Sequence, residues 1–236
     1  MNLFYSPDLA PLFTLDAEES RHAVRVLRLR AGDELCVTDG MGRLARCRVV
    51  APDERACTVE TVRIDTQAAP QAALTLAVAP TKNPSRMEWL VEKAVEVGVD
   101  AIALLQCDRS ERSFLKTDRL ERLAVSAMKQ SLHTRLPRIN PAVPVSDWLS
   151  AFGPRPSTLK LIAHCEAGQP RTPLGASLQP GRDAVVLIGP EGDFSEAEIA
   201  LALGHGFRPV SLGPSRLRTE TAALYAAVAF NLINDR

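Results

Sequence analysis

Two loops combine glycine, proline and charged residues directly after apolar stretches, and both are candidates for chemistry. The first lies in VVLIGPEGDFSEAEI (185–199) and the second in SLGPSRLRTETAA (211–223). Glycine lets a ligand approach the backbone closely, whereas proline fixes φ and removes a hydrogen-bond donor. Such loops can hold a flat ring through main-chain groups. Neither loop matches the glycine-rich patterns that cradle nucleotide phosphates, so we do not expect a phosphate site.

The second loop places charge at the start of an almost wholly apolar helix. Arg218 has the chemistry to hold a substrate anion or a polarised carbonyl. A structural alternative exists for this stretch, in which Thr219 is the N-cap and the helix dipole favours a negative Glu220. Both interpretations stay open from the residues alone.

The acidic residues of the first loop also have structural alternatives. Glu191 stands inside the Gly-Pro-Glu-Gly turn, where it either binds a ligand or braces the loop. Ser195 and Glu198 form the S-x-x-E pattern of a capping box, which favours helix capping for Glu198.

The elements that position these loops alternate between strand and helix from Leu74 onward. The patterns predict strands over 74–80, 101–107, 158–165, 184–190 and 207–213, and helices over 85–98, 118–132, 195–206 and 219–235. This alternation predicts an α/β fold with a parallel sheet covered on both faces. Ligands bind outside the carboxyl ends of such strands, and three of these strands end in IAHCEAG, IGPEGD and SLGPSRLRTE.

The N-terminal part of the sequence has a different pattern of apolar and turn-forming residues. Short strand-like segments at 34–40, 43–52 and 56–64, punctuated by Gly40, Gly42 and Pro52, predict a small β-barrel. Residues 65–73 are typical of a linker. For 236 residues we expect one or two domains, here 1–70 and 71–236.

Composition narrows the function classes. The formal net charge is zero, so nucleic-acid affinity would have to come from local basic patches. Five dispersed cysteines without a C-x-x-C pair predict reduced thiols in a cytoplasmic protein, and four histidines without ligand spacing predict no metal. The first residues do not resemble a signal peptide, and the apolar runs are far shorter than the ~20 residues that span a bilayer.

The two loops together resemble the ribosomal RNA small subunit methyltransferase E family of SPOUT methyltransferases. HAVRVLRLRAGDEL, TKNPSRMEWLVEKAVEVGVDAI and SERS agree with that family, so the resemblance covers nearly the whole chain. It implies a PUA-like β-barrel over 1–70, followed by a SPOUT domain with a C-terminal trefoil knot. It also implies a homodimer, S-adenosylmethionine as methyl donor, and methylation of uracil N3 in the 16S ribosomal RNA of the small subunit.

The resemblance further assigns roles to positions in the three loops. The implied cofactor-binding residues are His164, Cys165, Glu166, Ile188, Gly189, Pro190, Glu191, Gly192, Leu212, Gly213, Ser215, Arg216 and Leu217. We expect the catalytic residues to be Arg218, Thr219 and Glu220. The chain departs from the family at Asp193, where glycine is usual, and at Leu132 and His133, where glycine and arginine are usual.

Several basic residues are candidates for RNA contact, with a solvated surface as the alternative. They are Arg21, Arg25, Arg28, Lys82, Arg86, Lys129, Gln130, Arg135 and Arg138. If the segment around Arg25 is helical, Arg21, Arg25 and Arg28 share one face, with Val24 and Leu27 on the other. Trp89 lies off the apolar stripe of its helix, where dimer contact, interdomain contact and core packing are all open.

The implied reaction predicts roles for two charged residues. Uracil N3 must lose its proton before it can attack a sulfonium methyl group, so we expect Arg218 to stabilise the uracil anion. Glu220, or a group of a partner subunit, would accept the proton. The alternatives are a SPOUT enzyme that methylates ribose 2′-oxygens and a non-catalytic RNA-binding assembly factor.

Overall fold

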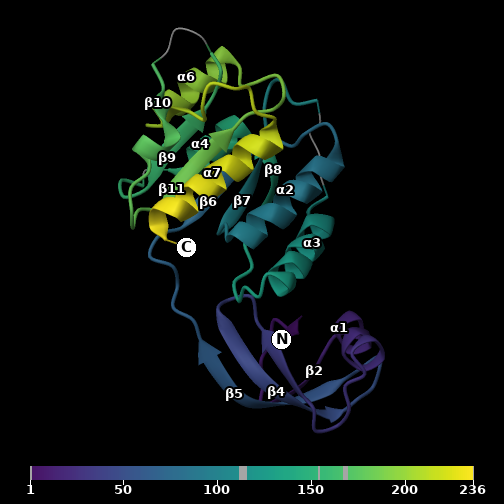
Figure 1. Cartoon of the computed structure of the whole chain (residues 1–236). Helices are drawn as coiled ribbons and strands as arrows, with labels where there is room; N and C mark the ends of the chain where they lie inside the picture. The colour runs from purple at the N-terminus through teal and green to yellow at the C-terminus, as the bar shows by residue number, and fades with distance from the viewer. Residues whose placement is uncertain (1, 112–115, 154, 167–169, 236) are drawn as a thin grey trace. The chain divides into compact units, whose positions relative to one another are not determined.

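The computed structural model describes residues 2–111, 116–153, 155–166 and 170–235. The chain forms two compact units, one of Met1–Ala69 with Val125–Leu136 and the other of Pro70–Ala124 with Pro137–Arg236 (Figure 1). The expected domain boundary at residue 70 lies next to Ala69, where the N-terminal segment of the first unit ends. Residues 125–136, which that boundary assigns to the second domain, pack with the first unit.

The first unit is built on a five-stranded mixed sheet with the order β1-β3-β4-β5-β2. Its strands are β1 (Leu3–Tyr5), β2 (Leu12–Thr14), β3 (Glu34–Thr38), β4 (Arg43–Ala51) and β5 (Thr58–Thr66). Alternate residues of β4, namely Ala45, Cys47 and Val49, are buried in its core, as the two-residue period of a strand requires. The curled sheet agrees with the predicted small barrel, although β1 and β2 were not predicted.

A short helical segment covers part of this sheet. Asp16 caps α1 (Ala17–Arg21) by accepting hydrogen bonds from the backbone N–H groups of Glu18 and Glu19, and a π-helical turn, η1 (His22–Val26), follows. The turn ends at Leu27, and Arg28 has a φ of +59°. The condition for Arg28 to share a helical face with Arg21 and Arg25 is therefore not met, because the left-handed backbone at Arg28 has already left the helix.

The C-terminal end of α3 (Thr117–Gln130) and the loop after it belong to the first unit. Thr134 accepts hydrogen bonds through its carbonyl oxygen from the Thr38 hydroxyl at 3.1 Å and from the Gly42 N–H at 2.9 Å. The Leu136 N–H donates to the Gly40 carbonyl at 2.8 Å. These bonds attach residues 125–136 to the turn between β3 and β4.

The second unit is a seven-stranded sheet in which every pairing is parallel, with the order β10-β12-β9-β11-β6-β7-β8. The strands are β6 (Leu74–Val78), β7 (Ala101–Gln106), β8 (Arg138–Pro144), β9 (Leu159–Ala163), β10 (Thr172–Pro173), β11 (Ala184–Ile188) and β12 (Arg208–Ser211). The predicted parallel α/β sheet is confirmed. β8 and β10 were not predicted, because both run through proline-containing polar sequence rather than an apolar run.

Helices cover both faces of this sheet. They are α2 (Pro84–Val97), α4 (Val145–Phe152), α5 (Leu174–Ser177), α6 (Glu196–Gly204) and α7 (Thr219–Asn234). Val185 and Leu187 of β11 share a core with residues of α4 and α6, whereas α2 and α7 lie side by side, with α7 against β6 and β11 (Figure 1). All five residues of β11 are buried, which explains its unbroken apolar run.

The register of the central strands brings three loops together. Ala163 of β9 pairs with Ile188 of β11 on one side and with Val210 of β12 on the other. Because the strands are parallel, the loops after β9, β11 and β12 leave the same edge of the sheet. The trefoil knot implied by the resemblance stays a prediction. In the described residues, every helix is too short or too polar to cross a membrane.

Candidate functional site

A cavity of about 610 Å³ lies where these three loops meet. Its size is within the usual range for a small-molecule site. All thirteen residues to which the resemblance assigns cofactor binding line it: His164, Cys165, Glu166, Ile188, Gly189, Pro190, Glu191, Gly192, Leu212, Gly213, Ser215, Arg216 and Leu217. Arg218 and Thr219 line it as well. Residues 167–169 and 112–115, which include parts of IAHCEAG and SERS, lie outside the described residues.

Arg171 was not among the predicted site residues, yet it lines the cavity and holds one of its loops. Its guanidinium Nη1 donates a 2.6 Å hydrogen bond to the carbonyl oxygen of His164. Arg171 immediately precedes β10, a strand of two residues paired with β12. Such a short strand leaves no periodic pattern, so the sequence carried no signal for this residue.

Two glycines meet different requirements in the cavity wall. A Cβ atom on Gly189 would lie 3.0 Å from a ring carbon of Phe194, a buried residue of the same loop. Glycine therefore allows Phe194 to fill the space beneath the loop. Gly213 has a φ of +110° with open space around it, so backbone conformation, rather than crowding, requires glycine there.

Asp193, the departure from the family pattern, ties two of the loops together. It has a φ of +63°, which aspartate tolerates better than most residues. Its Oδ2 accepts a 2.7 Å hydrogen bond from the Cys165 N–H, and its Oδ1 accepts a 2.8 Å bond from the Phe194 N–H. The side chain that replaces the usual glycine thus supplies a contact that glycine cannot make.

Thr219 joins the start of α7 to the loop after β11. Its hydroxyl is buried and donates a 3.0 Å hydrogen bond to the carbonyl oxygen of Gly189. The prediction that Thr219 is the N-cap is wrong, because Arg218 occupies that position with extended backbone (φ −70°, ψ 156°) and makes no side-chain cap bond. The threonine hydroxyl therefore bonds to the loop after β11 and does not cap its own helix.

His164 is a buried residue of the cavity lining. The residue is 4% exposed, and neither ring nitrogen has a hydrogen-bond partner among the described residues. Burial lowers the pKa of His164 below its ordinary value, with Arg171 contributing, while the charges of Asp193 and Glu166 act in the opposite direction. The neutral ring offers one donor and one acceptor, and the described protein atoms use neither.

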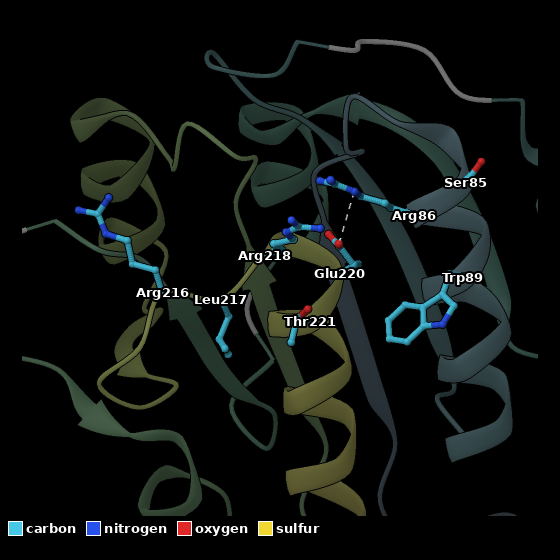
Figure 2. A pocket seen from close by; sticks show the side chains of 8 residues that line it. All are labelled: Ser85, Arg86, Trp89, Arg216, Leu217, Arg218, Glu220 and Thr221. Atoms are coloured by element: carbon cyan, nitrogen blue, oxygen red, sulfur yellow. Dashed lines mark ion pairs between the residues drawn. The ribbon is translucent and has the colours of Figure 1, made fainter.

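A second cavity of about 580 Å³ lies between α2 and the start of α7. Figure 2 shows its lining residues: Ser85, Arg86, Trp89, Arg216, Leu217, Arg218, Glu220 and Thr221. Three of them, Arg216, Leu217 and Arg218, also line the first cavity. The two cavities therefore adjoin at the segment 216–218.

Charged side chains from three elements converge at this second cavity. The Arg86 guanidinium lies 3.7 Å from Oε1 of Glu220 and 3.9 Å from Oε1 of Glu191. Oε2 of Glu220 is buried and has no hydrogen-bond partner among the described residues. In Figure 2, Arg86 and Arg218 both reach toward the Glu220 carboxylate, while Arg216 points away from it.

The remaining acidic residues of the first loop are used structurally. Glu198 completes the predicted capping box with Ser195, and its Oε1 also accepts a 2.8 Å hydrogen bond from the Asp108 N–H. The capping prediction for Glu198 is confirmed. Glu191 accepts a 3.3 Å bond from the Lys82 N–H, so it braces its own loop against the segment before α2.

Four of the predicted RNA-contacting residues are held by protein partners. Lys129 pairs with the buried Glu19, and Arg135 donates a 2.9 Å hydrogen bond to the carbonyl oxygen of Gln67. Lys82 pairs with Glu111 at 2.6 Å, and Arg86 belongs to the cluster described above. Five residues are exposed: Arg21, Arg25, Arg28, Gln130 and Arg138. Trp89 is 42% exposed, so the core-packing alternative for it is wrong.

Comparison with known proteins decides the family. A family model described as an RNA methyltransferase domain matches residues 67–231, and one described as an RNA methyltransferase PUA domain matches residues 15–62. A relative from Synechocystis, named ribosomal RNA small subunit methyltransferase E, is 31% identical over 93% of this chain and 73% of its own length. The chain belongs to the ribosomal RNA small subunit methyltransferase E family. The resemblance drawn from the two loops is confirmed.

Solved structures of similar proteins share the fold of this family member. A probable rRNA methyltransferase from Porphyromonas gingivalis has a TM-score of 0.92 and 41% identity, covering 100% of this chain and 99% of that one. A ribosomal RNA small subunit methyltransferase E from Neisseria gonorrhoeae, solved bound to S-adenosyl methionine, has a TM-score of 0.83 and 28% identity. That comparison covers 99% of this chain and 98% of the other. These similarities agree with an α/β methyltransferase fold preceded by a PUA-like domain.

Proposed function

We propose that this protein transfers a methyl group from S-adenosylmethionine to N3 of a uracil in 16S ribosomal RNA. The observation that carries the proposal is the pair of adjoining cavities that share Arg218, one of them built from the three family loops. The names of its relatives and the cofactor bound to the Neisseria protein support the same activity.

The first cavity fits the proposed cofactor in size and in chemistry. Its lining combines the apolar residues Ile188, Leu212 and Leu217 with polar residues that include His164, Ser215 and Thr219. S-adenosylmethionine supplies an electrophilic methyl group on a sulfonium when bound. We propose that the thirteen loop residues hold its adenosine and amino-acid parts, with Asp193 and Thr219 keeping the loops in position.

We propose that the charged residues of the second cavity act on the uracil. N3 of uracil carries a proton that must leave before the nitrogen can attack, and the resulting negative charge spreads over O2 and O4. Arg218 stabilises that charge, and the unpartnered Oε2 of Glu220 accepts the proton. The N3–methyl bond forms as the sulfur–methyl bond breaks, so S-adenosylhomocysteine leaves and the proton passes from Glu220 to solvent.

We further propose that the protein works as a cytoplasmic homodimer, with a PUA-like domain over 1–70 and a knotted SPOUT domain over 71–236. Tyr225, Val228 and Leu232 support dimerisation, because they are 48%, 41% and 78% exposed and lie on one face of α7. A second copy of the chain would cover this apolar stripe. The exposed Arg21, Arg25, Arg28 and Arg138 are the residues that we propose for RNA phosphate contact.

The decisive experiment uses labelled S-adenosylmethionine with unmodified small subunits and, separately, with free 16S rRNA. Methylation at N3 blocks base pairing and stops reverse transcription, whereas a ribose 2′-O-methyl group resists alkaline cleavage. A reverse-transcription stop at one uridine is the expected result. Alkali resistance at the labelled nucleotide would indicate a ribose methyltransferase, and calorimetry without cofactor binding would indicate a non-catalytic RNA-binding protein.

A further inference from the structure

We infer that the second cavity holds the target base and selects uracil through a donor–acceptor–donor row formed by Arg86, Glu220 and Arg218. This inference rests on the proposed function and adds to it a specificity-determining residue, Arg86, together with a basis for rejecting cytosine. It also assigns to Arg86 a role other than phosphate contact.

The position of the second cavity suits the acceptor of a methyl group. It shares the lining residues 216–218 with the first cavity, so a base in one cavity and a cofactor in the other meet at the same segment. The second cavity is reached between α2 and the start of α7 (Figure 2). A nucleotide turned out of an RNA strand can therefore enter it without passing through the first cavity.

The polar groups of this cavity complement one base edge. Uracil presents an acceptor, a donor and an acceptor at O2, N3–H and O4. Arg86 and Arg218 offer guanidinium donors near the Glu220 carboxylate, an acceptor (Figure 2), and we place these groups against O2, O4 and N3–H. Cytosine presents an acceptor at N3, which would face the carboxylate oxygen, and a donor at N4, which would face an arginine. Both pairings are repulsive, so cytosine is rejected.

The Glu220 carboxylate has hydrogen-bonding capacity that the described protein atoms do not use. The side chain of Glu220 is 9% exposed, and its Oε2 has no hydrogen-bond partner among the described residues. Leaving a carboxylate oxygen in this state is costly unless another group uses it. The Arg86 distances of 3.7 Å and 3.9 Å to Glu220 and Glu191 exceed those of ordinary hydrogen bonds. Arg86 is thus held near the row by charge while its N–H donors can turn to a base oxygen.

Trp89 gives the cavity a flat apolar wall. Its indole lies on α2, one turn after Ser85, and is 42% exposed at the edge of the cavity (Figure 2). Proteins that bind unstacked bases commonly place an aromatic ring against the base face. We place the ring of the target uracil against this indole.

The first test compares methyl transfer by three forms of the protein to RNA carrying uridine or cytidine at the target position. Wild type is expected to prefer uridine on the order of 10³-fold or more in kcat/KM. Arg86→Ala is expected to lower kcat/KM for uridine by about tenfold to a hundredfold and to reduce the preference. Arg119→Ala, the matched control, removes an arginine of α3 that pairs with Glu88 of α2 and lines neither cavity. It should behave as wild type.

Measuring cofactor affinity distinguishes a loss of base recognition from general damage to the folded protein. Calorimetry with S-adenosylmethionine should give the same affinity for Arg86→Ala as for wild type, and Arg86→Lys should recover part of the uridine preference. The inference is overturned if Arg86→Ala keeps the wild-type preference for uridine over cytidine. That result would leave the proposed function intact, because wild type would still methylate uracil N3.

A second test detects the base without turnover. Trp148→Phe leaves Trp89 as the single tryptophan of the chain. Binding of RNA with the target uridine should quench Trp89 fluorescence, and RNA with an abasic residue at that position should quench it much less. Equal quenching by the two RNAs would show that no base reaches this wall and would overturn the inference.

Discussion

The carboxylate of Asp193 accepts a 2.7 Å hydrogen bond from the backbone N–H of Cys165 and thereby joins the loop after β11 to the loop after β9. The same carboxylate also accepts a bond from the Phe194 N–H, the next residue in its own loop. One side chain thus fixes the distance between two walls of the proposed cofactor cavity. The residue that departs from the family pattern is a structural part of the site.

Replacing Asp193 separates the effect of its side chain from that of its backbone. Asp193→Ala should lower the free energy of unfolding by about 1–3 kcal/mol, because it removes the loop-joining bonds and leaves a β-carbon at positive φ. Asp193→Gly removes the bonds without that strain and should be less destabilising. Both variants should weaken cofactor binding about tenfold in calorimetry. Wild-type affinity in both would contradict a role for the loop-joining bond.

The hydroxyl of Thr219 should matter more for the site than for its helix. Thr219→Val keeps the shape but leaves the Gly189 carbonyl without this bond, so we expect a loss of about 1–3 kcal/mol in unfolding free energy and weaker cofactor binding. Thr219→Ser retains the hydroxyl and serves as the control. If serine and valine variants bind the cofactor equally well, the Thr219–Gly189 bond does not position the loop.

Glu198 should contribute to stability without contributing to ligand binding. Glu198→Ala removes the capping box and the bond to the Asp108 N–H, which predicts a loss of about 1–2 kcal/mol in chemical denaturation. Glu196→Ala, in the same helical turn but exposed, is the matched control and should cost less. Calorimetry should give wild-type cofactor affinity for both variants. A selective loss of affinity in Glu198→Ala would assign it to the site.

The lowered pKa of His164 predicts how the stability of the protein changes with pH. Burial lowers its pKa in the folded state below the ordinary value of 6.5, so the unfolded chain takes up a proton first as the pH falls. The stabilising contribution is fully present above pH 6.5 and is lost as the pH falls through the lower, folded-state pKa. Each unit of pKa depression corresponds to about 1.4 kcal/mol.

Denaturation of wild type and His164→Gln between about pH 7.5 and about pH 5 measures this contribution, because other titrating groups cancel in the comparison. Wild type should lose more stability than the variant over this range. Parallel pH profiles would show that the imidazole titrates alike in the folded and unfolded chain.

Much of the second unit could be predicted because its signals are local. The apolar run of β11 followed by glycine and proline predicts a buried strand with an open loop, and Ser195 with Glu198 predicts the start of α6. Several strands in series with helices predict a parallel sheet, and parallel strands carry their loops to one edge. The thirteen cofactor-site positions came from the family resemblance of those loops, and all of them line one cavity.

Contacts between residues distant in sequence were decided by the tertiary structure. Lys129 and Glu19 are separated by 110 residues, so no pattern in the region around Lys129 indicated that its charge is paired. Arg86 comes to Glu220, and Thr219 turns from its helix to Gly189, because packing of α7 against the sheet brings them together. A sequence specifies local propensity and periodicity directly, whereas a side chain's partner depends on the free energy of the whole packed arrangement.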